Sequence, residues 1–267
     1  MKSEDYAQGD AFQAEKRTIF STEWLPLCAE RQVANAGDFL STTVGGWGVV
    51  AVRDKAGDLR VLRNACRHQN MPVVGTPSGN CESLRCRFHG WTYDLAGKFV
   101  AAPPPVAPPD PKADLSLQSL ASARDGGLLF FSIGRPRSAP SLGALPAYGG
   151  TLSTDIAGNW KVVVEHLLGE RREASADFAW HWPLLAVRRA GTLAIVEQIM
   201  PQTFLRTRLL THVFGGAADL HKPAAATIKL VCERLQADRA AGTIPENDGV
   251  LLAEFRRRLR QDVPLAL

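Results

Sequence analysis

Short runs rich in β-branched and apolar residues occupy the stretch from residue 38 to residue 134, and they predict an antiparallel β domain. Turn-forming sequences such as DKAGD and DLAGK separate these runs, which read DFLSTTV, GVVAVRD, LRVLRN, SLRC, WTYD, KFVAA and LLFFSIG. The proline-rich stretch APPPVAPPDPKAD at 102–114 cannot pair as a central strand. We therefore expect it to form an irregular loop over the surface of the domain.

Longer apolar runs appear in the second half of the chain. TLAIVEQIM at 192–200 and TFLRTRLLTHVF at 203–214 predict a pair of strands. The densest basic run, EFRRRLRQ at 254–261, is interpreted as the solvated face of a terminal helix rather than as a binding patch.

Composition narrows the class of protein. The chain has 267 residues, of which 45% are hydrophobic and 22% charged, which is typical of a globular protein with two modest cores. The first 20 residues are polar and no apolar run approaches the roughly 20 residues that span a bilayer, so we expect a cytoplasmic protein. The net charge of +4 is mild and comes without an arginine–aromatic array, which argues against nucleic acid as a partner.

Residues 64–97 concentrate candidate metal ligands. This stretch holds three of the five cysteines and two of the six histidines. In a reducing compartment, clustered Cys and His indicate a metal before a disulfide. Two pairs stand out, and each follows a predicted strand: Cys66 with His68, and Cys86 with His89.

The spacing of these pairs is compatible with two kinds of centre. A tetrahedral zinc accepts two Cys and two His, but the ligands of one zinc pair are usually two to four residues apart, and Cys66-Arg67-His68 is tighter. In a Rieske [2Fe-2S] centre two thiolates hold one iron and two histidines hold the other, and C-x-H followed by C-x-x-H fits that arrangement.

The sequence HGWTYDLAGKF that follows resembles the Rieske domain in large subunits of ring-hydroxylating Rieske non-heme iron oxygenases. The resemblance implies that Cys66 and Cys86 bind a buried iron as thiolates, while His68 and His89 bind an outer iron. Cys81 is then a bystander. Trp91 stands where high-potential Rieske proteins have a serine, so we expect a reduction potential near the low end of the Rieske range, about −150 mV.

The stretch GNWKVVVEHLLGE at 158–170 resembles the Asn-Trp-Lys helix that opens the catalytic domain of the same oxygenases. The resemblance implies an α+β protein: an all-β Rieske domain followed by a shortened helix-grip domain, in which an antiparallel sheet packs with helices. We expect an N-terminal element at 1–37, the Rieske domain at 38–135 and the catalytic-like domain at 136–267.

The family's mononuclear iron site is not matched by this chain. That iron needs two histidines and a carboxylate on one face, with open positions opposite. Alignment on Asn-Trp-Lys places the two histidine positions on Arg172 and Asp177 or, one residue later, on Glu173 and Phe178. The family's aspartate position falls on Ile228. We expect mononuclear Fe(II) to be absent, although an unorthodox site that uses His166 and His181 stays open.

Three functions are therefore weighed. The favoured one is an electron-transfer and structural subunit of a multicomponent Rieske oxygenase, which passes electrons to the mononuclear iron of a homologous catalytic subunit in a mixed trimer or hexamer. A ferredoxin or reductase would be the donor, and Glu170, or else Glu173, would be the acidic bridge between subunits. The alternatives are an active oxygenase with an unorthodox iron site and a free-standing Rieske redox carrier.

Overall fold

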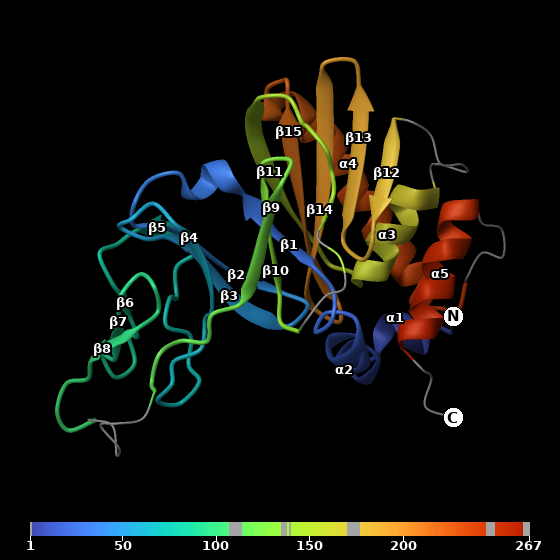
Figure 1. Cartoon of the computed structure of the whole chain (residues 1–267). Helices are drawn as coiled ribbons and strands as arrows, with labels where there is room; N and C mark the ends of the chain where they lie inside the picture. The colour runs from blue at the N-terminus through green and yellow to red at the C-terminus, as the bar shows by residue number, and fades with distance from the viewer. Residues whose placement is uncertain are drawn as a thin grey trace.

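The computed structural model describes residues 2–106, 114–134, 138, 140–169, 177–243 and 249–263. These residues form a β lobe, which carries the predicted ligand loops, and a C-terminal lobe of one sheet with helices against it (Figure 1). The expectation of an all-β domain followed by a sheet-and-helix domain is confirmed. None of the described helices is long and apolar enough to cross a lipid bilayer.

The β lobe is built from two small antiparallel sheets. The first has the order β4-β3-β2-β5, with strands β2 (Asp38–Val44), β3 (Trp47–Arg53), β4 (Leu59–Arg63) and β5 (Ser78–Asn80). The second has the order β6-β7-β8, with strands β6 (Leu84–Arg85), β7 (Thr92–Tyr93) and β8 (Phe99–Ala101). A core that includes Phe39, Val50 and Tyr93 joins the two sheets and packs under the ligand loops.

The two turn sequences recognised in the chain adopt the same hydrogen-bonded turn. Asp54 Oδ1 accepts the backbone N–H groups of Ala56 and Asp58, at 3.0 and 2.9 Å. Asp94 Oδ1 accepts those of Ala96 and Lys98, both at 2.9 Å. Each turn places a glycine, at 57 and 97, in the left-handed backbone region that an aspartate-led turn of this kind requires.

A third sheet, with the order β1-β10-β9, lies between the lobes; its strands are β1 (Leu25–Ala29), β9 (Ala121–Asp125) and β10 (Leu128–Ser132). Every residue of β1 and β10 is buried. Leu129 and Phe131 belong to the main core, whereas Leu128 and Phe130 join a smaller cluster against the C-terminal sheet. Burial on both faces explains why LLFFS reads as a continuous apolar run rather than as an alternating one.

The C-terminal lobe has a five-stranded antiparallel sheet in the order β11-β15-β14-β13-β12. Its strands are β11 (Tyr148–Ile156), β12 (Phe178–His181), β13 (Leu185–Ala190), β14 (Leu193–Thr203) and β15 (Arg206–Phe214). The helices α3 (Trp160–Gly169), α4 (Lys222–Ala240) and α5 (Val250–Asp262) pack together and against this sheet (Figure 1). The predicted terminal helix is therefore present, but three residues of the basic run, Phe255, Arg256 and Leu259, are buried rather than solvated.

The N-terminal helices α1 (Glu4–Ala7) and α2 (Gly9–Thr18) pack on the C-terminal lobe. Short 3-10 helices follow β1 and β15, at Glu30–Val33 and Ala218–His221. The chain therefore begins in the C-terminal lobe, passes into the β lobe through β1, and returns through β9 and β10. This path places the sheet of β1, β9 and β10 between the two lobes.

Candidate iron-sulfur centre

The two ligand loops have the same backbone hydrogen bonds although their motifs differ in length. In the first loop, Cys66 N–H donates to Met71 O and Asn70 N–H donates to Cys66 O, both at 2.8 Å. In the second, Cys86 N–H donates to Trp91 O at 2.9 Å and Gly90 N–H donates to Cys86 O at 2.8 Å. Each loop thus pairs the cysteine with the residues four and five positions later, so both cysteines start an equivalent turn.

The residue that closes each turn has a positive φ. Asn70 has φ 57° and Gly90 has φ 72°. Glycine adopts this left-handed conformation freely, and asparagine is among the few other residues that tolerate it. The first loop is also tied to its own strand, because Asn64 Nδ2 donates to Val74 O at 2.8 Å while Asn64 Oδ1 accepts Val74 N–H at 2.9 Å.

The four predicted ligands come together at the tips of these loops. The His68 and His89 rings lie edge to face with centroids 4.7 Å apart, and both cysteines are 2% exposed. Burial raises the pKa of the Cys86 thiol, and the nearby Cys66 sulfur raises it further. Cys81, the predicted bystander, is half-buried, and its N–H donates to Gly37 O at the end of the paired strands β2 and β5.

One nitrogen at this site lacks a hydrogen-bond partner. His68 Nδ1 is buried and no described residue donates to it or accepts from it. Buried polar atoms in native proteins are nearly always paired, so an unpaired imidazole nitrogen beside a second histidine fits a metal ligand. Two thiolates and two imidazoles are the donor set of a Rieske cluster, and the residues present therefore fit that group.

Tyr93 on β7 and Trp91, just before β7, contact the proposed ligands Cys66 and His68. Tyr93 Oη lies 3.3 Å from Cys66 Sγ and accepts the Arg67 N–H at 3.1 Å, so its own proton is available to the sulfur. Trp91 stacks on the His68 ring at 5.0 Å, and its Nε1 donates to Val106 O at 2.8 Å. The Tyr93 hydroxyl, which no sequence pattern singled out, supplies a donor to the Cys66 sulfur although the serine of high-potential Rieske proteins is absent.

In the C-terminal lobe, the Asn-Trp-Lys motif at the start of α3 binds the N-terminal helix α2. Trp160 Nε1 donates to Glu15 Oε2 at 2.7 Å, and Lys161 Nζ forms an ion pair with Glu15 Oε1. Asn159 Oδ1 accepts the Lys161 N–H at 3.0 Å, and Gln236 Oε1 of α4 accepts the Asn159 N–H at 2.9 Å. The motif thus joins α2, α3 and α4 through buried polar side chains.

One turn further along α3, Glu165 is the centre of a second buried network. Its Oε2 accepts Arg239 Nε at 3.0 Å, and its Oε1 accepts Arg256 Nη2 at 3.2 Å and the Tyr6 hydroxyl at 2.6 Å. Burial, followed by the charge of Glu165, raises the pKa of Tyr6, which keeps the hydroxyl protonated as a donor. Two guanidinium groups therefore lie between α3, α4 and α5.

The positions aligned with the mononuclear iron ligands are not brought together among the described residues. Asp177 is exposed, Phe178 is buried on β12, and Ile228 is half-buried on α4. Arg172, Glu173 and the predicted bridge Glu170 lie outside the described residues. Glu233, which the resemblance places on α4, accepts the Ala157 N–H at 3.0 Å.

The histidines of the alternative iron site lie on different elements. His166 is half-buried on α3, and His181 is half-buried on β12, where burial and the charge of Arg189 lower its pKa. In the described part of the chain, no three His, Cys, Asp or Glu side chains converge on a point that could hold one metal ion. This result is compatible with a cluster held by Cys66, His68, Cys86 and His89. In a two-iron cluster the thiolates and the imidazoles bind different iron atoms, so no single ion is bound by three of these residues.

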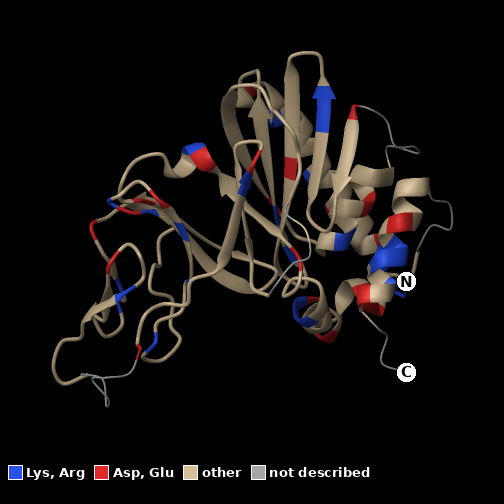
Figure 2. Ribbon diagram, viewed as in Figure 1, with Lys and Arg blue, Asp and Glu red and all other residues tan. Residues whose placement is uncertain are grey.

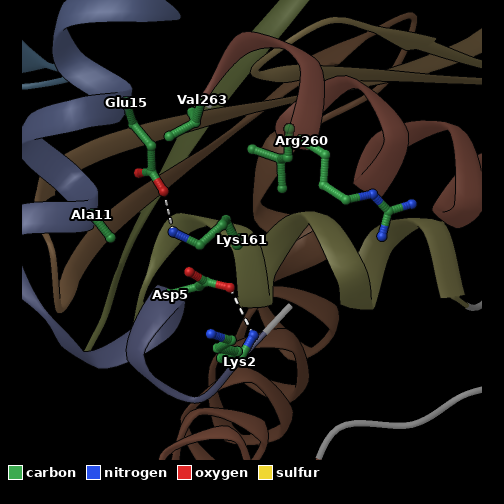
Figure 3. A pocket seen from close by; sticks show the side chains of 8 residues that line it. Lys2, Asp5, Ala11, Glu15, Lys161, Arg260 and Val263 are labelled. Carbon is green, nitrogen blue, oxygen red and sulfur yellow. Dashed lines mark hydrogen bonds and ion pairs between the residues drawn. The ribbon is translucent and has the colours of Figure 1, made fainter. Parts of the chain in front are cut away.

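A cavity of about 160 Å³ lies among α1, α2, α3 and α5 (Figure 3). Figure 3 shows Lys161 pointing at Glu15 across it, while Arg260 points away from this pair. Within the lining, the Lys161 and Glu15 side chains neutralise each other and are almost fully buried.

Comparison with known proteins decides the identity of the β lobe. A family model described as the Rieske [2Fe-2S] domain matches residues 23–121. These residues are a Rieske domain. The matched range therefore includes β1 and ends at Ala121, the first residue of β9.

Over this domain the chain is homologous to alpha subunits of aromatic ring-hydroxylating dioxygenases. It is 40% identical over 98 residues to biphenyl dioxygenase subunit alpha of Metapseudomonas furukawaii, which is 37% of this chain and 21% of that protein. It is 38% identical over 98 residues to a benzene 1,2-dioxygenase subunit alpha of Pseudomonas putida, or 22% of that protein. The match therefore spans about a fifth of the length of these relatives.

Solved structures extend the likeness to the whole fold. The quaternary ammonium Rieske monooxygenase CntA superimposes with a TM-score of 0.77 at 17% identity, covering 98% of this chain and 95% of that chain. Naphthalene 1,2-dioxygenase from Rhodococcus sp. superimposes with a TM-score of 0.66 at 15% identity, covering 100% and 95%. The Rieske domain and the C-terminal lobe together thus have the fold of Rieske oxygenases.

Proposed function

We propose that this protein is an electron-transfer subunit of a Rieske oxygenase assembly. Its Rieske domain would hold a [2Fe-2S] cluster through the sulfurs of Cys66 and Cys86 and the imidazoles of His68 and His89. When bound, such a cluster accepts and releases one electron at a time. The acceptor would be the mononuclear iron of a homologous catalytic subunit.

The residues around the proposed ligands have separate tasks. Tyr93 donates its hydroxyl hydrogen toward Cys66 Sγ, which favours electron density on that sulfur. Trp91 fixes the His68 ring plane by stacking, and Trp91 is in turn fixed by its bond to Val106 O. The His89 ring is half-buried, so one edge of the ligand pair can reach another protein.

The observation that carries the proposal is the Glu165 network. The Glu165 carboxylate of α3 is already bound by the guanidinium groups of Arg239 on α4 and Arg256 on α5. Guanidinium groups cannot coordinate a metal and repel a divalent cation. This packing favours a C-terminal lobe without a mononuclear iron, so that the electron has to leave the chain.

A mixed ring of subunits would supply the acceptor. For CntA, electron transfer is described as inter-subunit. A closed ring repeats the same head-to-tail contact at each step, so degenerate and intact subunits could alternate in it. Glu170, with Glu173 as second choice, stays the proposed acidic bridge, although both lie outside the described residues.

The iron content of the purified protein tests the proposal. We expect iron near two atoms per chain and a Rieske-type EPR signal in the reduced state, both lost in Cys66→Ser and His89→Ala. Cys81→Ser is the matched control and should retain both, because Cys81 lies outside the two ligand loops and its N–H bonds Gly37 O. Zinc in place of iron would contradict the cluster assignment.

Two further outcomes would replace the proposal with its alternatives. A third iron that disappears in His166→Ala or His181→Ala would indicate an active oxygenase with an unorthodox site. Failure of the loaded protein to associate with any intact oxygenase subunit, with two irons present, would indicate a free-standing redox carrier.

A further inference from the structure

The cavity among α1, α2, α3 and α5, here called the helix cavity, has a mostly apolar wall (Figure 3). Ala11 of α2, Leu259 of α5 and Val263, which follows α5, line it together with charged residues that contribute mainly their methylene groups. Its volume is about 160 Å³. Because an apolar cavity of about 150 Å³ holds one benzene molecule, this one has room for a compact molecule of about six or seven non-hydrogen atoms.

The charged residues of the lining differ in burial. The side chains of Lys161 and Glu15 are only 1% and 4% exposed. Lys2 and Arg260 are exposed, and Asp5 is half-buried, with its Oδ2 accepting the backbone N–H of Lys2 at 2.7 Å. The buried ion pair therefore lies at the inner end of the helix cavity, and the exposed residues lie at the end that faces solvent.

Lys161 has more hydrogen-bond donors than the described residues use. An ammonium group has three N–H bonds. In the described part of the chain, Lys161 Nζ donates to Glu15 Oε1, and its other contacts are with the Tyr6 and Trp160 rings, whose centres lie 5.8 and 5.7 Å away. Since buried polar groups are nearly always paired, an acceptor on a molecule in the helix cavity would complete the hydrogen bonds of this ammonium group.

The charges around the helix cavity favour a neutral molecule. Glu15 already neutralises Lys161, and its two oxygens are bound by Lys161 and Trp160. A ligand carboxylate would be buried beside the Glu15 carboxylate, and a ligand ammonium would be buried beside Lys161, so either charge would be repelled. Figure 2 shows basic and acidic segments next to one another on α2 and α5, so the surrounding surface does not favour either sign.

We propose that the helix cavity binds a small neutral alcohol, whose hydroxyl oxygen accepts a hydrogen bond from Lys161 Nζ. The apolar body of the alcohol packs against Ala11, Leu259 and Val263. The hydroxyl hydrogen is donated to a Glu15 oxygen, because a carboxylate has lone pairs beyond the two that Lys161 and Trp160 use. Binding is non-covalent and does not involve the cluster, so this inference goes beyond the proposed function.

A bound alcohol joins helices from both ends of the chain. Ala11 and Glu15 come from α2, Lys161 comes from α3, and Leu259 comes from α5. A ligand that binds only the folded chain raises the melting temperature by mass action. The helix cavity is therefore a ligand-dependent contact between the N-terminal helices and the C-terminal lobe.

The test uses the full-length protein and cyclohexanol as the probe, because it combines one hydroxyl with a compact apolar ring. Isothermal titration calorimetry measures its Kd, and scanning calorimetry measures Tm with and without it. We expect saturable binding and a rise in Tm. Cyclohexylamine and cyclohexanecarboxylate carry the same ring but are charged at neutral pH, and each should have a Kd at least about tenfold higher.

A cavity-filling substitution tests the location. Ala11→Leu places extra carbon atoms in the helix cavity, so the Kd of cyclohexanol should rise by about tenfold or more, while the Tm of the ligand-free protein does not fall. Ala14→Leu is the matched control, because Ala14 is also half-buried on α2 but does not line the helix cavity. It should change Kd by less than about twofold.

A double variant tests the polar contact. Glu15→Met/Lys161→Met removes both charges together, so that neither stays buried without its partner, and its melting transition shows whether it is folded. In the wild type, cyclohexane should bind about tenfold more weakly than cyclohexanol, because it offers no acceptor to Lys161. In the double variant this difference should disappear.

The other outcomes would overturn the alcohol site. Without saturable binding of cyclohexanol, the helix cavity would hold water only. Equal Kd values for Ala11→Leu and Ala14→Leu would place the alcohol elsewhere. Wild-type binding of cyclohexane as tight as that of cyclohexanol would contradict the contact with Lys161. None of these measurements depends on the iron content, so their failure would leave the proposed function unchanged.

Discussion

The ligand loops of the Rieske domain and the region around helix α3 of the C-terminal lobe differ in whether their polar side chains already have hydrogen-bond partners. In the loops, the backbone makes its own hydrogen bonds, so that Cys86 and His68 Nδ1 are not used in strong bonds to described residues. Around α3, both oxygens of Glu165 and both oxygens of Glu15 from α2 are bound by neighbouring side chains. A metal can enter the first arrangement, whereas the second is already satisfied.

Ion pairs hold the helices of the C-terminal lobe together around Glu165. A buried carboxylate without a metal needs another positive partner, since an unpaired buried charge is costly. Arg239 and Arg256 supply it, from α4 and α5. The helices then keep the arrangement seen in Rieske oxygenases while their interior is held together by ion pairs.

The largest expected effect comes from removing the carboxylate at the centre of the α3 network. Glu165→Ala leaves Arg239 buried without the carboxylate that its Nε bonds and removes one partner of Arg256, and we expect it to lower the free energy of unfolding by about 3–5 kcal/mol. Urea denaturation followed by tryptophan fluorescence measures this loss. Asp155→Ala is the control: it breaks an exposed ion pair with Arg208, so it should cost about 0–1 kcal/mol.

Glu165→Ala also tests whether the two lobes depend on each other. If the Glu165 network is purely structural, then Glu165→Ala should keep its two irons per chain under native conditions, because the cluster ligands lie in the other lobe. Loss of iron in folded Glu165→Ala would show instead that the two regions depend on each other.

The sequence was sufficient to predict the ligand loops because their information is local. Both Cys/His pairs lie within four residues, and the turn sequences that bracket them carry their own glycine and aspartate signals. The strands that were missed had weak signals. β5 is three exposed residues, β9 has alternating small and charged residues, and Pro26 lies in β1, which is an edge strand.

The α3 network could not be predicted for the opposite reason. Glu165 contacts Tyr6, Arg239 and Arg256 across 159, 74 and 91 residues, respectively. The Asn-Trp-Lys motif predicted the helix, but no pattern in the chain identified Glu15 as its partner. Because residues 1–37 were treated as a separate element, their role in closing the C-terminal lobe became visible only in three dimensions.

A smaller effect concerns the junction between the two regions. His212 on β15 is fully buried; its Nδ1 lies 2.7 Å from Thr151 Oγ1 and its Nε2 lies 2.9 Å from Gln198 Oε1. Gln198 Nε2 donates in turn to Pro26 O and Leu27 O of β1. This chain of hydrogen bonds joins the C-terminal sheet to the first strand of the Rieske domain.

Acidification should therefore destabilise the junction. Burial lowers the pKa of His212 to about 3 in the folded chain, whereas an unfolded histidine titrates near 6.5. Below about pH 6.5 the unfolded chain binds a proton that the folded chain does not, so stability falls as pH falls toward 3. Between pH 7 and pH 5 we expect a loss of about 2 kcal/mol from this group.

Urea midpoints at these two pH values, for wild type and His212→Gln, measure the contribution. The variant should lose less stability on acidification, although it is less stable at pH 7. His181, whose pKa is also lowered by burial, contributes in the same direction, and His181→Asn separates the two. An unchanged pH dependence in His212→Gln would show that the junction does not sense protons.

The smallest expected effect concerns the hydrogen bond between the Tyr93 hydroxyl and Cys66 Sγ in the first ligand loop. Tyr93 donates toward Cys66 Sγ at 3.3 Å, and this bond strengthens as electron density on the sulfur increases, which occurs on reduction of a bound cluster. Tyr93→Phe removes the donor and keeps the ring that packs against Phe99. If the bond favours the reduced form by about 1 kcal/mol, the midpoint potential should fall by about 40 mV, measured by EPR-monitored redox titration.

Thr92→Val is the control on the same strand, because its hydroxyl bonds Gly90 O rather than a sulfur. A potential that does not move in Tyr93→Phe would show that the hydroxyl serves only to hold the Arg67 N–H, and the expectation of about −150 mV would then rest on Trp91 alone.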